Sequence, residues 1–348
     1  MTPENNSTAW APLLAIRPGN NVNALNSVVL SEPWSGSRYL VDSDKFFDAV
    51  AHTMTGIGAE PEPINQLRSM GLLGAPPIPE DKKRMISHWY GRGWEYSLSY
   101  YLWMRRCRYS DGTDKSGSRR REILSRYIND RAAPHRLRQE GERIELSEGS
   151  AIEESPSLSK LLTSRRTLRH FVPQPISRAI FASFLWKGLD KVRGSRRQQN
   201  EDKPLSLLIS YGIAFDFYIV AYNVEGLEQG VYYYDCEAHS LTVLSGATTR
   251  EKMREILQFQ TASDTAGFTM LLVADTRQCQ WRYRHERALR NLYIEAGRIG
   301  HELILAGMLF GLGSFPTPAL SDKKVSEFLG LKMDQQIPIY SLTIGEAP

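Results

Sequence analysis

Three arginines within five residues form a group suited to gripping a phosphate. Arg165, Arg166 and Arg169 follow one another closely, and Ser164 and Thr167 add hydroxyl donors beside them. Guanidinium groups bind a phosphate dianion through forked, charge-assisted hydrogen bonds. An arginine run by itself is more often a solvated surface, but this one lies at a predicted helix end, ahead of a capped helix and several strands. The sequence therefore predicts an anion site here.

A second group sets a cation beside a phenol. Arg282 and Tyr283 are neighbours, and a long predicted helix carrying Glu295 and Gly297 follows them. Apolar residues recur through that helix at spacings of three and four, at Ala288, Leu292, Ala296, Ile299, Leu303, Ala306 and Phe310. The pair is therefore predicted to lie at the mouth of a buried helix, whose other end is marked by Gly311 and Gly313.

The elements that must position these groups indicate an α+β fold. Ser177 caps a predicted helix that Gly188 closes. Strand-like runs follow at residues 217–222, 231–234, 241–244, 267–274 and 337–344. Pro338 places the start of the last run at an edge or a bulge. The polar stretch 190–204 is predicted to be a loop. Helices packed around a largely antiparallel sheet form an α+β core.

Several sequence pieces together resemble a known family. They are Ser164–Phe171 (SRRTLRHF), Tyr218–Leu227 (YIVAYNVEGL), Gly230–Asp235 (GVYYYD), Ile294–Gly297 (IEAG), Ala306–Ser314 (AGMLFGLGS) and Leu329–Leu331 (LGL). Over residues 159–345 the chain resembles the nitroreductase-fold, FMN-dependent peptide dehydrogenases of the SagB type. These enzymes oxidise thiazoline and oxazoline rings in ribosomal peptide natural products.

The resemblance implies a cofactor, a reaction and a homodimer. FMN would lie at the dimer interface, in contact with residues equivalent to Arg165, Arg166, Thr167, Arg169, Ser210, Gly212, Gly311 and Gly313. A general base would remove the Cα proton of the azoline ring while hydride passes to flavin N5, and oxygen could reoxidise the flavin. The implied partners are a leader-bearing ribosomal precursor peptide and a cyclodehydratase-type enzyme.

Two family motifs are altered in this sequence. The family uses a Lys-Tyr pair for the base step, where this chain has Arg282-Tyr283. Arginine stays protonated at working pH, so it cannot be the base, but its charge favours the phenolate of Tyr283. The family's Pro-Ser-x-Gly and Tyr-Pro motifs are replaced by a run over 204–214, with Ser210 to Gly212 as the remnant. The family usually reads Glu-Ala-Gly-His where this chain has Arg298 after Gly297, and His301 lies one turn further on. We interpret His301 as an ordinary helix histidine, with a site residue as the alternative.

Composition excludes several classes of function. The chain has 348 residues, a formal charge of +4 and three cysteines that are far apart in sequence, so neither a zinc motif nor a disulfide framework is indicated. Short basic runs such as 119–121 lack interleaved aromatics and are interpreted as surface, which argues against nucleic acid. No apolar run of about 18 residues exists and the N-terminus has no secretory pattern. A cytoplasmic protein without a membrane segment is expected.

The chain is predicted to contain four parts. Residues 1–40 form an N-terminal arm and residues 41–110 a winged-helix-like region that handles the precursor peptide. Residues 111–155 form a linker, and residues 156–348 the nitroreductase-like FMN domain. Within the first three parts, we expect helices at 44–56 and 63–72, an aromatic-rich helix at 84–108, a loop at 109–122 and a strand at 143–146.

Three functions remain open on sequence alone. The first is azoline dehydrogenation with FMN. The second keeps the flavin but changes the chemistry, for example to dehydroamino-acid reduction or oxidation of another peptide bond, with Arg282 as an electrostatic stabiliser. The third is a flavin-free scaffold subunit of a peptide-modifying complex. Flavin binding separates the first two functions from the third.

Overall fold

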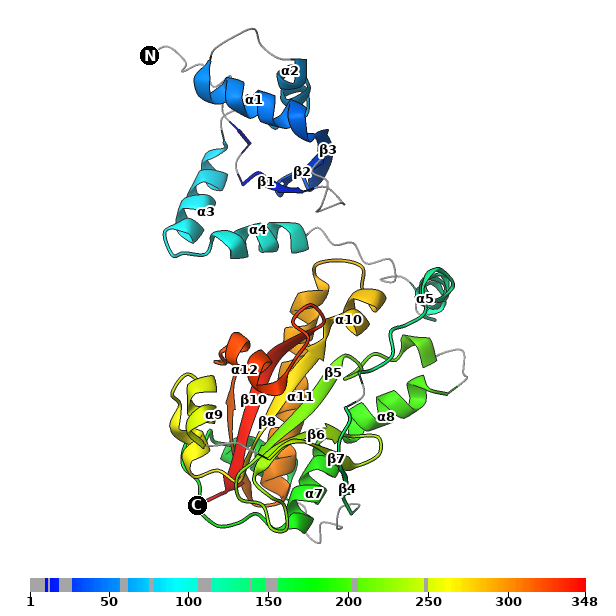
Figure 1. The fold of residues 1–348 in the computed structure, drawn as a ribbon, viewed down its shortest axis with the longest axis vertical. Helices are drawn as coiled ribbons and strands as arrows, with labels where there is room; N and C mark the ends of the chain where they lie inside the picture. Colours follow the sequence, from blue (N-terminus) through cyan, green and yellow to red (C-terminus); the bar gives the residue numbers. More distant parts are fainter. Residues whose placement is uncertain are drawn as a thin grey trace. The chain divides into compact units, whose positions relative to one another are not determined.

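The protein divides into two compact units, which a computed structural model describes (Figure 1). Unit 1 comprises residues 1–108 and unit 2 residues 109–348. The described residues are 10–11, 13–18, 27–56, 62–74, 78–105, 114, 116–137, 139–147, 156–201, 206–246 and 250–348. Parts of the predicted arm, linker and altered loop, including Pro204, lie outside them.

Unit 1 pairs a small antiparallel sheet with helices. Strands β1 (Ala15–Pro18), β2 (Ser27–Glu32) and β3 (Ser37–Asp42) lie in the order β1-β2-β3, and helices α1 (Ser43–Thr55) and α2 (Glu62–Ser69) follow. The core of this unit includes Leu30, Phe46, Ile64, Leu67 and Leu72. The helices predicted at 44–56 and 63–72 are confirmed. The winged-helix-like character of the region stays a prediction.

The aromatic segment of unit 1 forms two helices, so the prediction of one helix over 84–108 is wrong. Helix α3 (Glu80–Tyr90) and helix α4 (Glu95–Met104) are separated by a turn in which Gly93 has a φ of +70°. A left-handed backbone breaks the helical hydrogen-bond ladder, and glycine adopts it readily. Across the turn, Trp89 contacts Trp94 and stacks on Tyr101.

The described strands of unit 2 form one antiparallel sheet, called the large sheet below. Its order is β4-β7-β6-β5-β8-β10-β9. The strands are β4 (Arg143–Glu145), β5 (Phe215–Ala221), β6 (Gly230–Asp235), β7 (Ser240–Ser245), β8 (Phe268–Asp275), β9 (Leu312–Thr317) and β10 (Gln336–Glu346). The strand predictions in this unit are confirmed, and a register shift between Pro338 and Tyr340 is the expected bulge. The α+β class is therefore correct.

Helices cover both faces of the large sheet. On one face, Phe217 and Ile219 of β5 pack with helices α7 (Arg178–Gly188) and α11 (Ala288–Leu309). On the other face, the alternate β5 residues pack with helices α9 (Arg250–Ile256) and α12 (Asp322–Leu329). Side chains alternate between faces along a strand, so both sides of β5 are buried.

Two predicted loops are helical. Residues 190–204 contain helix α8 (Asp190–Gln199), and the loop expected over 109–122 gives way at Ser118 to helix α5 (Ser118–Asp130). The face of α8 that is buried carries Val192, Arg193 and Arg196. Polar sequence was interpreted as loop because arginine is normally exposed, whereas here two arginines face inward.

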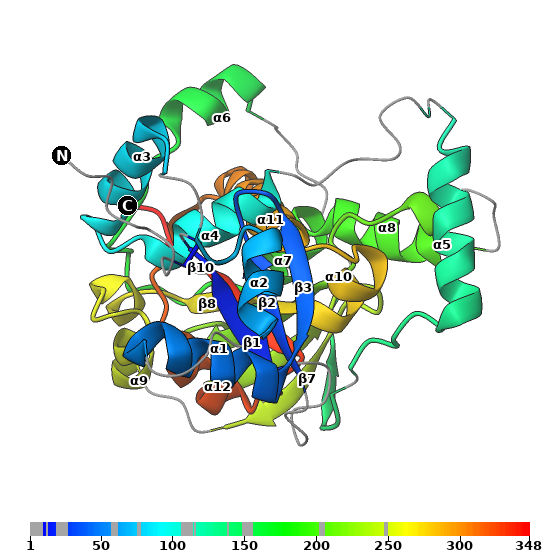
Figure 2. The ribbon, with the colours of Figure 1, turned by 90° about the horizontal axis from the view of Figure 1, so that it is seen from above.

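Short elements connect these layers. Helix α6 (Leu158–Ser164) precedes the arginines, a 3-10 turn η2 (Ser206–Leu208) precedes β5, and helix α10 (Thr276–Arg282) precedes α11. Helix α5 lies beside α10, as Figure 2 shows, and the indole of Trp281 donates a 2.7 Å hydrogen bond to the carbonyl of Arg131. Of the helices in the described ranges, none is both long and apolar enough to cross a membrane.

Candidate functional site

The arginine segment, residues 164–169, lies against the edge strand β9. The amide of Leu168 donates to the carbonyl of Ser314 at 3.0 Å. A Cβ on Gly313 would overlap the Leu168 side chain, and a Cβ on Gly345 of β10 would lie 2.6 Å from Phe171 Cβ. The two glycines therefore let the segment sit directly on the strands. Gly311, whose φ is +73°, ends α11 at the same place.

The three guanidinium groups of this segment make hydrogen bonds and a ring contact but no ion pair with a described residue. Arg166 donates to the carbonyls of Thr163 and Arg165 at 3.0 Å each, and Arg165 donates to Thr167 Oγ1 at 3.5 Å. The Arg169 guanidinium lies 5.4 Å from the ring centroid of Phe315. Within the part of the chain that the structure describes, none of these three arginines forms an ion pair. Such a group has the charge and the donors that a phosphate requires.

The remnant of the altered loop is tied to α11 through Gly212. Its φ is +71°, a Cβ there would lie 2.6 Å from both methyl groups of Val192, and its amide donates to Glu295 Oε1 at 2.5 Å. Ser210 accepts a hydrogen bond at its carbonyl from the amide of Ile213 at 3.3 Å. Burial raises the pKa of Glu295, and the Gly212 amide, Arg298 and Arg282 oppose that shift.

Arg282, the last residue of α10, is anchored inside the protein. Its side chain donates from Nη2 to the Leu207 carbonyl at 2.6 Å, and the residue is 6% exposed. Burial lowers the pKa of the Arg282 guanidinium, and the neighbouring Tyr283 opposes the shift. Its Nε has no hydrogen-bond partner among the described residues. A buried, fixed guanidinium can stabilise negative charge, but it cannot accept a proton.

Two guanidinium groups lie close to the ring of Tyr283. The Arg282 guanidinium is 5.8 Å from its ring centroid, and that of Arg120 is 5.2 Å away. Arg120 also donates to the Arg282 carbonyl at 3.0 Å. Cations this close to an aromatic ring are attracted to it. Arg120 comes from α5, in the predicted linker, and sequence reasoning missed it because the run at 119–121 was interpreted as surface.

The predicted site residues therefore fall into two groups within one chain. The arginine segment, Gly311 and Gly313 gather where α11 ends, beside β9. Arg282, Tyr283, Ser210 and Gly212 gather where α11 begins, around Glu295. Helix α11 has 22 residues and spans roughly 33 Å at about 1.5 Å per residue. Exposed His301 lies between the two groups, on α11.

Comparison with known proteins gives matches that cover the site residues of unit 2 and matches that extend beyond them. A family model described as the nitroreductase family matches residues 162–346. The trifolitoxin operon protein TfxC of Rhizobium leguminosarum bv. trifolii is 25% identical over 291 residues, which cover 81% of this chain and 80% of TfxC. The trifolitoxin-processing protein TfxB of the same organism is 28% identical over 120 residues, or 33% of this chain and 32% of TfxB.

One solved structure among the matches is the Escherichia coli microcin synthetase McbBCD complex with truncated pro-MccB17 bound. The matched chain is 14% identical with a TM-score of 0.42, and the match covers 66% of this chain and 94% of that one.

The raised pKa of Glu295 predicts a pH dependence of stability. A carboxyl whose pKa is higher in the folded state than its ordinary 4.5 contributes stability that is fully present below that value. The contribution is lost as the pH rises through the raised pKa. Glu295→Gln keeps an oxygen for the Gly212 amide and removes the titration, so its free energy of unfolding should fall less than that of the wild type as pH rises above 4.5.

Urea titrations at a series of pH values measure this difference. Glu225→Gln, which removes an exposed turn carboxylate, controls for the loss of one acid and should follow the wild-type curve. Parallel curves for Glu295→Gln and the wild type would contradict the assigned environment of Glu295.

Proposed function

The chain belongs to the nitroreductase family, and we propose that it is an FMN-dependent oxidoreductase that dehydrogenates thiazoline or oxazoline rings in a ribosomal peptide. The observation that carries this proposal is the arginine segment on β9, which forms no ion pair with any described residue, in a family domain whose relative TfxB is named for trifolitoxin processing. The match to TfxC is longer than the family domain and so extends into the N-terminal region as well.

The arginine segment fits the phosphate of FMN. Arg165 and Arg166 would hold two of its oxygens and Arg169 a third position, with Thr167 as a hydroxyl donor. When bound, FMN supplies the acceptor for the hydride. The close seating of residues 168 and 171 against Gly313 and Gly345 fixes the segment to the sheet, so that its donors are held in place before a ligand arrives.

Tyr283 is the group we propose to remove the Cα proton. The guanidinium groups of Arg120 and Arg282 lie 5.2 and 5.8 Å from its ring centroid, so positive charge is in place beside the proposed base. Arg282 stays a cation and holds the turn through the Leu207 carbonyl. Arg282 also supports a second candidate function, a flavin enzyme with altered chemistry, because it occupies the lysine position of the family's Lys-Tyr motif. A fixed cation there can stabilise a developing anion without moving a proton.

A homodimer is proposed because one chain separates the two halves of the site. The arginine segment and Tyr283 lie toward opposite ends of α11, a span of roughly 33 Å that exceeds one FMN molecule. Leu289, Tyr293 and Ile294 are 37%, 54% and 54% exposed on that helix. A Cβ on Gly297 would meet no atom within 4 Å, so a second helix has room to approach there. Antiparallel pairing of two α11 helices would join complementary halves.

Unit 1 supplies a candidate surface for the precursor peptide. Within the described residues, β3 pairs with β2 alone, which leaves its other side as a sheet edge. An extended peptide can add to such an edge as a further strand, held by backbone hydrogen bonds. Leu40 on β3 is 67% exposed and would lie next to the side chains of the added strand.

Flavin binding tests the arginine segment. We expect purified protein to take up about one FMN per chain, and Arg165→Ala with Arg166→Ala to weaken FMN binding at least ~100-fold, since two charge-assisted bonds are lost. Visible absorption and fluorescence titration measure both. Arg178→Ala is the control, because this half-buried arginine of α7 donates to the carbonyls of Gly226 and Glu145. Stoichiometric FMN bound to the double variant would contradict the phosphate assignment. A wild-type protein that binds no flavin would rule out both enzyme candidates.

Tyr283→Phe tests the base. The substitution keeps the ring beside its two arginines, so FMN absorption should persist while azoline oxidation falls by roughly 10²–10⁴-fold, as expected for loss of general base catalysis. Turnover of an azoline-bearing peptide, followed by the loss of two mass units per ring, measures it. Tyr96→Phe, at a residue 91% exposed in unit 1, is the control. Unchanged turnover in Tyr283→Phe would refute its assignment.

Arg282→Lys then separates the two flavin candidates. A rise in azoline oxidation means that the family's Lys-Tyr chemistry is latent in this chain. Loss of a native activity instead means that the arginine has its own role in altered chemistry.

Edge variants test peptide recognition. We expect Leu40→Asp to weaken binding of the leader-bearing precursor roughly fivefold, because the cross-strand contact is lost. Ile16→Asp, on the opposite edge strand β1 and 53% exposed, should bind as the wild type does. Fluorescence anisotropy with a labelled precursor measures both. If both variants bind the precursor equally weakly, or if Leu40→Asp binds it as tightly as the wild type does, the precursor does not bind along β3.

A further inference from the structure

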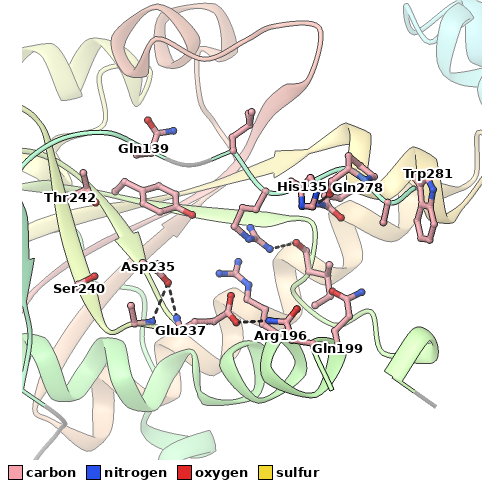
Figure 3. Close-up of a pocket in the computed structure, with 18 of the residues that line it drawn as sticks. His135, Gln139, Arg196, Gln199, Asp235, Glu237, Ser240, Thr242, Gln278 and Trp281 are labelled. Atoms are coloured by element: carbon pink, nitrogen blue, oxygen red, sulfur yellow. Dashed lines mark hydrogen bonds between the residues drawn. The ribbon is translucent and has the colours of Figure 1, made fainter. Parts of the chain in front are cut away.

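A cavity of about 820 Å³ lies beside strands β6 and β7 of the large sheet (Figure 3). Segment 133–143, helix α8 and the end of α10 complete its wall. Its size is in the range of ligand sites, roughly 300–1,000 Å³. The arginine segment lies at the opposite edge strand, β9, and contributes no residue to the cavity. Of the predicted site residues, Arg282 alone lines it.

Two guanidinium groups in the cavity wall converge on one backbone oxygen. Arg136 Nη1 donates to the Phe215 carbonyl at 2.9 Å, and Arg196 Nη2 donates to the same oxygen. The Asp216 carboxylate lies on the Arg136 side, 2.5 Å from its Nη1, and also accepts from the Tyr233 hydroxyl at 3.1 Å. Burial acts to lower the pKa of Arg136, but Asp216 outweighs it and the pKa is raised. Among the described residues, this carboxylate pairs with Arg136 and not with Arg196.

Arg196 is the cation left without a counter-charge. It is 2% exposed, and no carboxylate among the described residues lies within 4.0 Å of its nitrogens. Its Nη1 donates to Cys236 Sγ at 2.9 Å, and its Nε has no partner there. Burial raises the pKa of the Cys236 thiol, with Arg196 and Arg136 opposing, so the sulfur is a neutral acceptor. A buried cation without a counter-ion lowers the stability of the fold. Arg196 is therefore a candidate to bind an anion that does not come from the described residues.

The rest of the lining matches a peptide with a single negative charge. Amide and hydroxyl side chains face the cavity, from Gln139, Gln199, Asn200, Ser240, Thr242 and Gln278, and they suit a peptide backbone. Asp235 and Glu237 also line it, and they are held by the turn amides and by Asn200. These two carboxylates would repel a phosphate dianion more strongly than a monovalent carboxylate.

We propose that this cavity binds an acidic residue of the peptide substrate, with its carboxylate at Arg196. The inference rests on the proposed function only in taking the ligand to be a peptide. It places a specificity site directly behind the pair of Arg282 and Tyr283, because Arg282 belongs to both the pair and the cavity wall. Binding there would select peptides that carry Glu or Asp near the ring to be modified.

Calorimetric titration of the full-length protein tests this inference. The probes are acetyl-Gly-Glu-Gly-amide, its glutamine counterpart and inorganic phosphate, all at one ionic strength. We expect the glutamate peptide to bind at least ~10-fold more tightly than the glutamine peptide, because a charge-assisted bond replaces a neutral one. Arg196→Gln should remove that preference. Lys191→Gln, on the same helix with an exposed side chain paired to Glu302, makes the same charge change and should keep it.

Gln199→Glu keeps the test decisive where Arg196→Gln fails to fold. This substitution places a carboxylate in the cavity, three residues from Arg196 on α8. It should weaken binding of the glutamate peptide at least ~10-fold. Equal affinities for the two peptides in the wild type, unchanged binding in Gln199→Glu, or tighter binding of phosphate than of the glutamate peptide would each overturn the proposal. The titrations are run with and without FMN and need no turnover, so their failure is distinct from a failure of flavin binding or azoline oxidation.

Discussion

Close packing of α11 against the large sheet and α7 is the constraint on which both halves of the site depend. A Cβ on Gly300 would overlap the Tyr340 ring on β10, and one on Gly188 of α7 would lie 2.7 Å from Leu303 Cδ2. These contacts fix the helix along its length. Its start then positions Glu295 to hold Gly212, and its end delivers Gly311 and Gly313 to the arginine segment. A rigid helix thus sets the distance between the two groups.

That distance is the reason for the proposal that two copies of the chain complete the site. In that proposal, the arginine segment, which has no ion pair among the described residues, holds a phosphate, and the end with Tyr283 removes the proton. A rigid helix of about 33 Å cannot bring them together by bending. The exposed apolar residues at the start of α11 supply the surface through which a second copy can bring its opposite half. Dimerisation and catalysis are therefore one proposal, since the pairing that buries Ile294 would also assemble the site.

Regular patterns in the sequence were enough to predict most of the central fold. The apolar spacing of α11, the cap at Ser177 and the β-branched and aromatic strand runs each reflect local rules, and the structure confirms them. Helix α8 was missed because its buried face carries Arg193 and Arg196, whose burial depends on partners distant in sequence. Arg120 was missed for the same reason, since only tertiary structure brings α5 to Tyr283. The site assignments from family resemblance remain predictions.

In the proposed reaction, Arg282 stands where the family resemblance implies a lysine, and this difference changes the surroundings of the reacting groups more than it removes a base. A lysine can lose its proton when buried, whereas arginine holds its charge in the same place. The guanidinium can also bridge three features at once: the Leu207 carbonyl, the ring of Tyr283 and the cavity behind it. An anion in that cavity would partly neutralise Arg282, the same cation that lies 5.8 Å from the ring centroid of Tyr283. The charge of a ligand in the cavity and proton removal at Tyr283 would then be coupled through the Arg282 side chain. A lysine has a single side-chain nitrogen and could not contact all three features in this way.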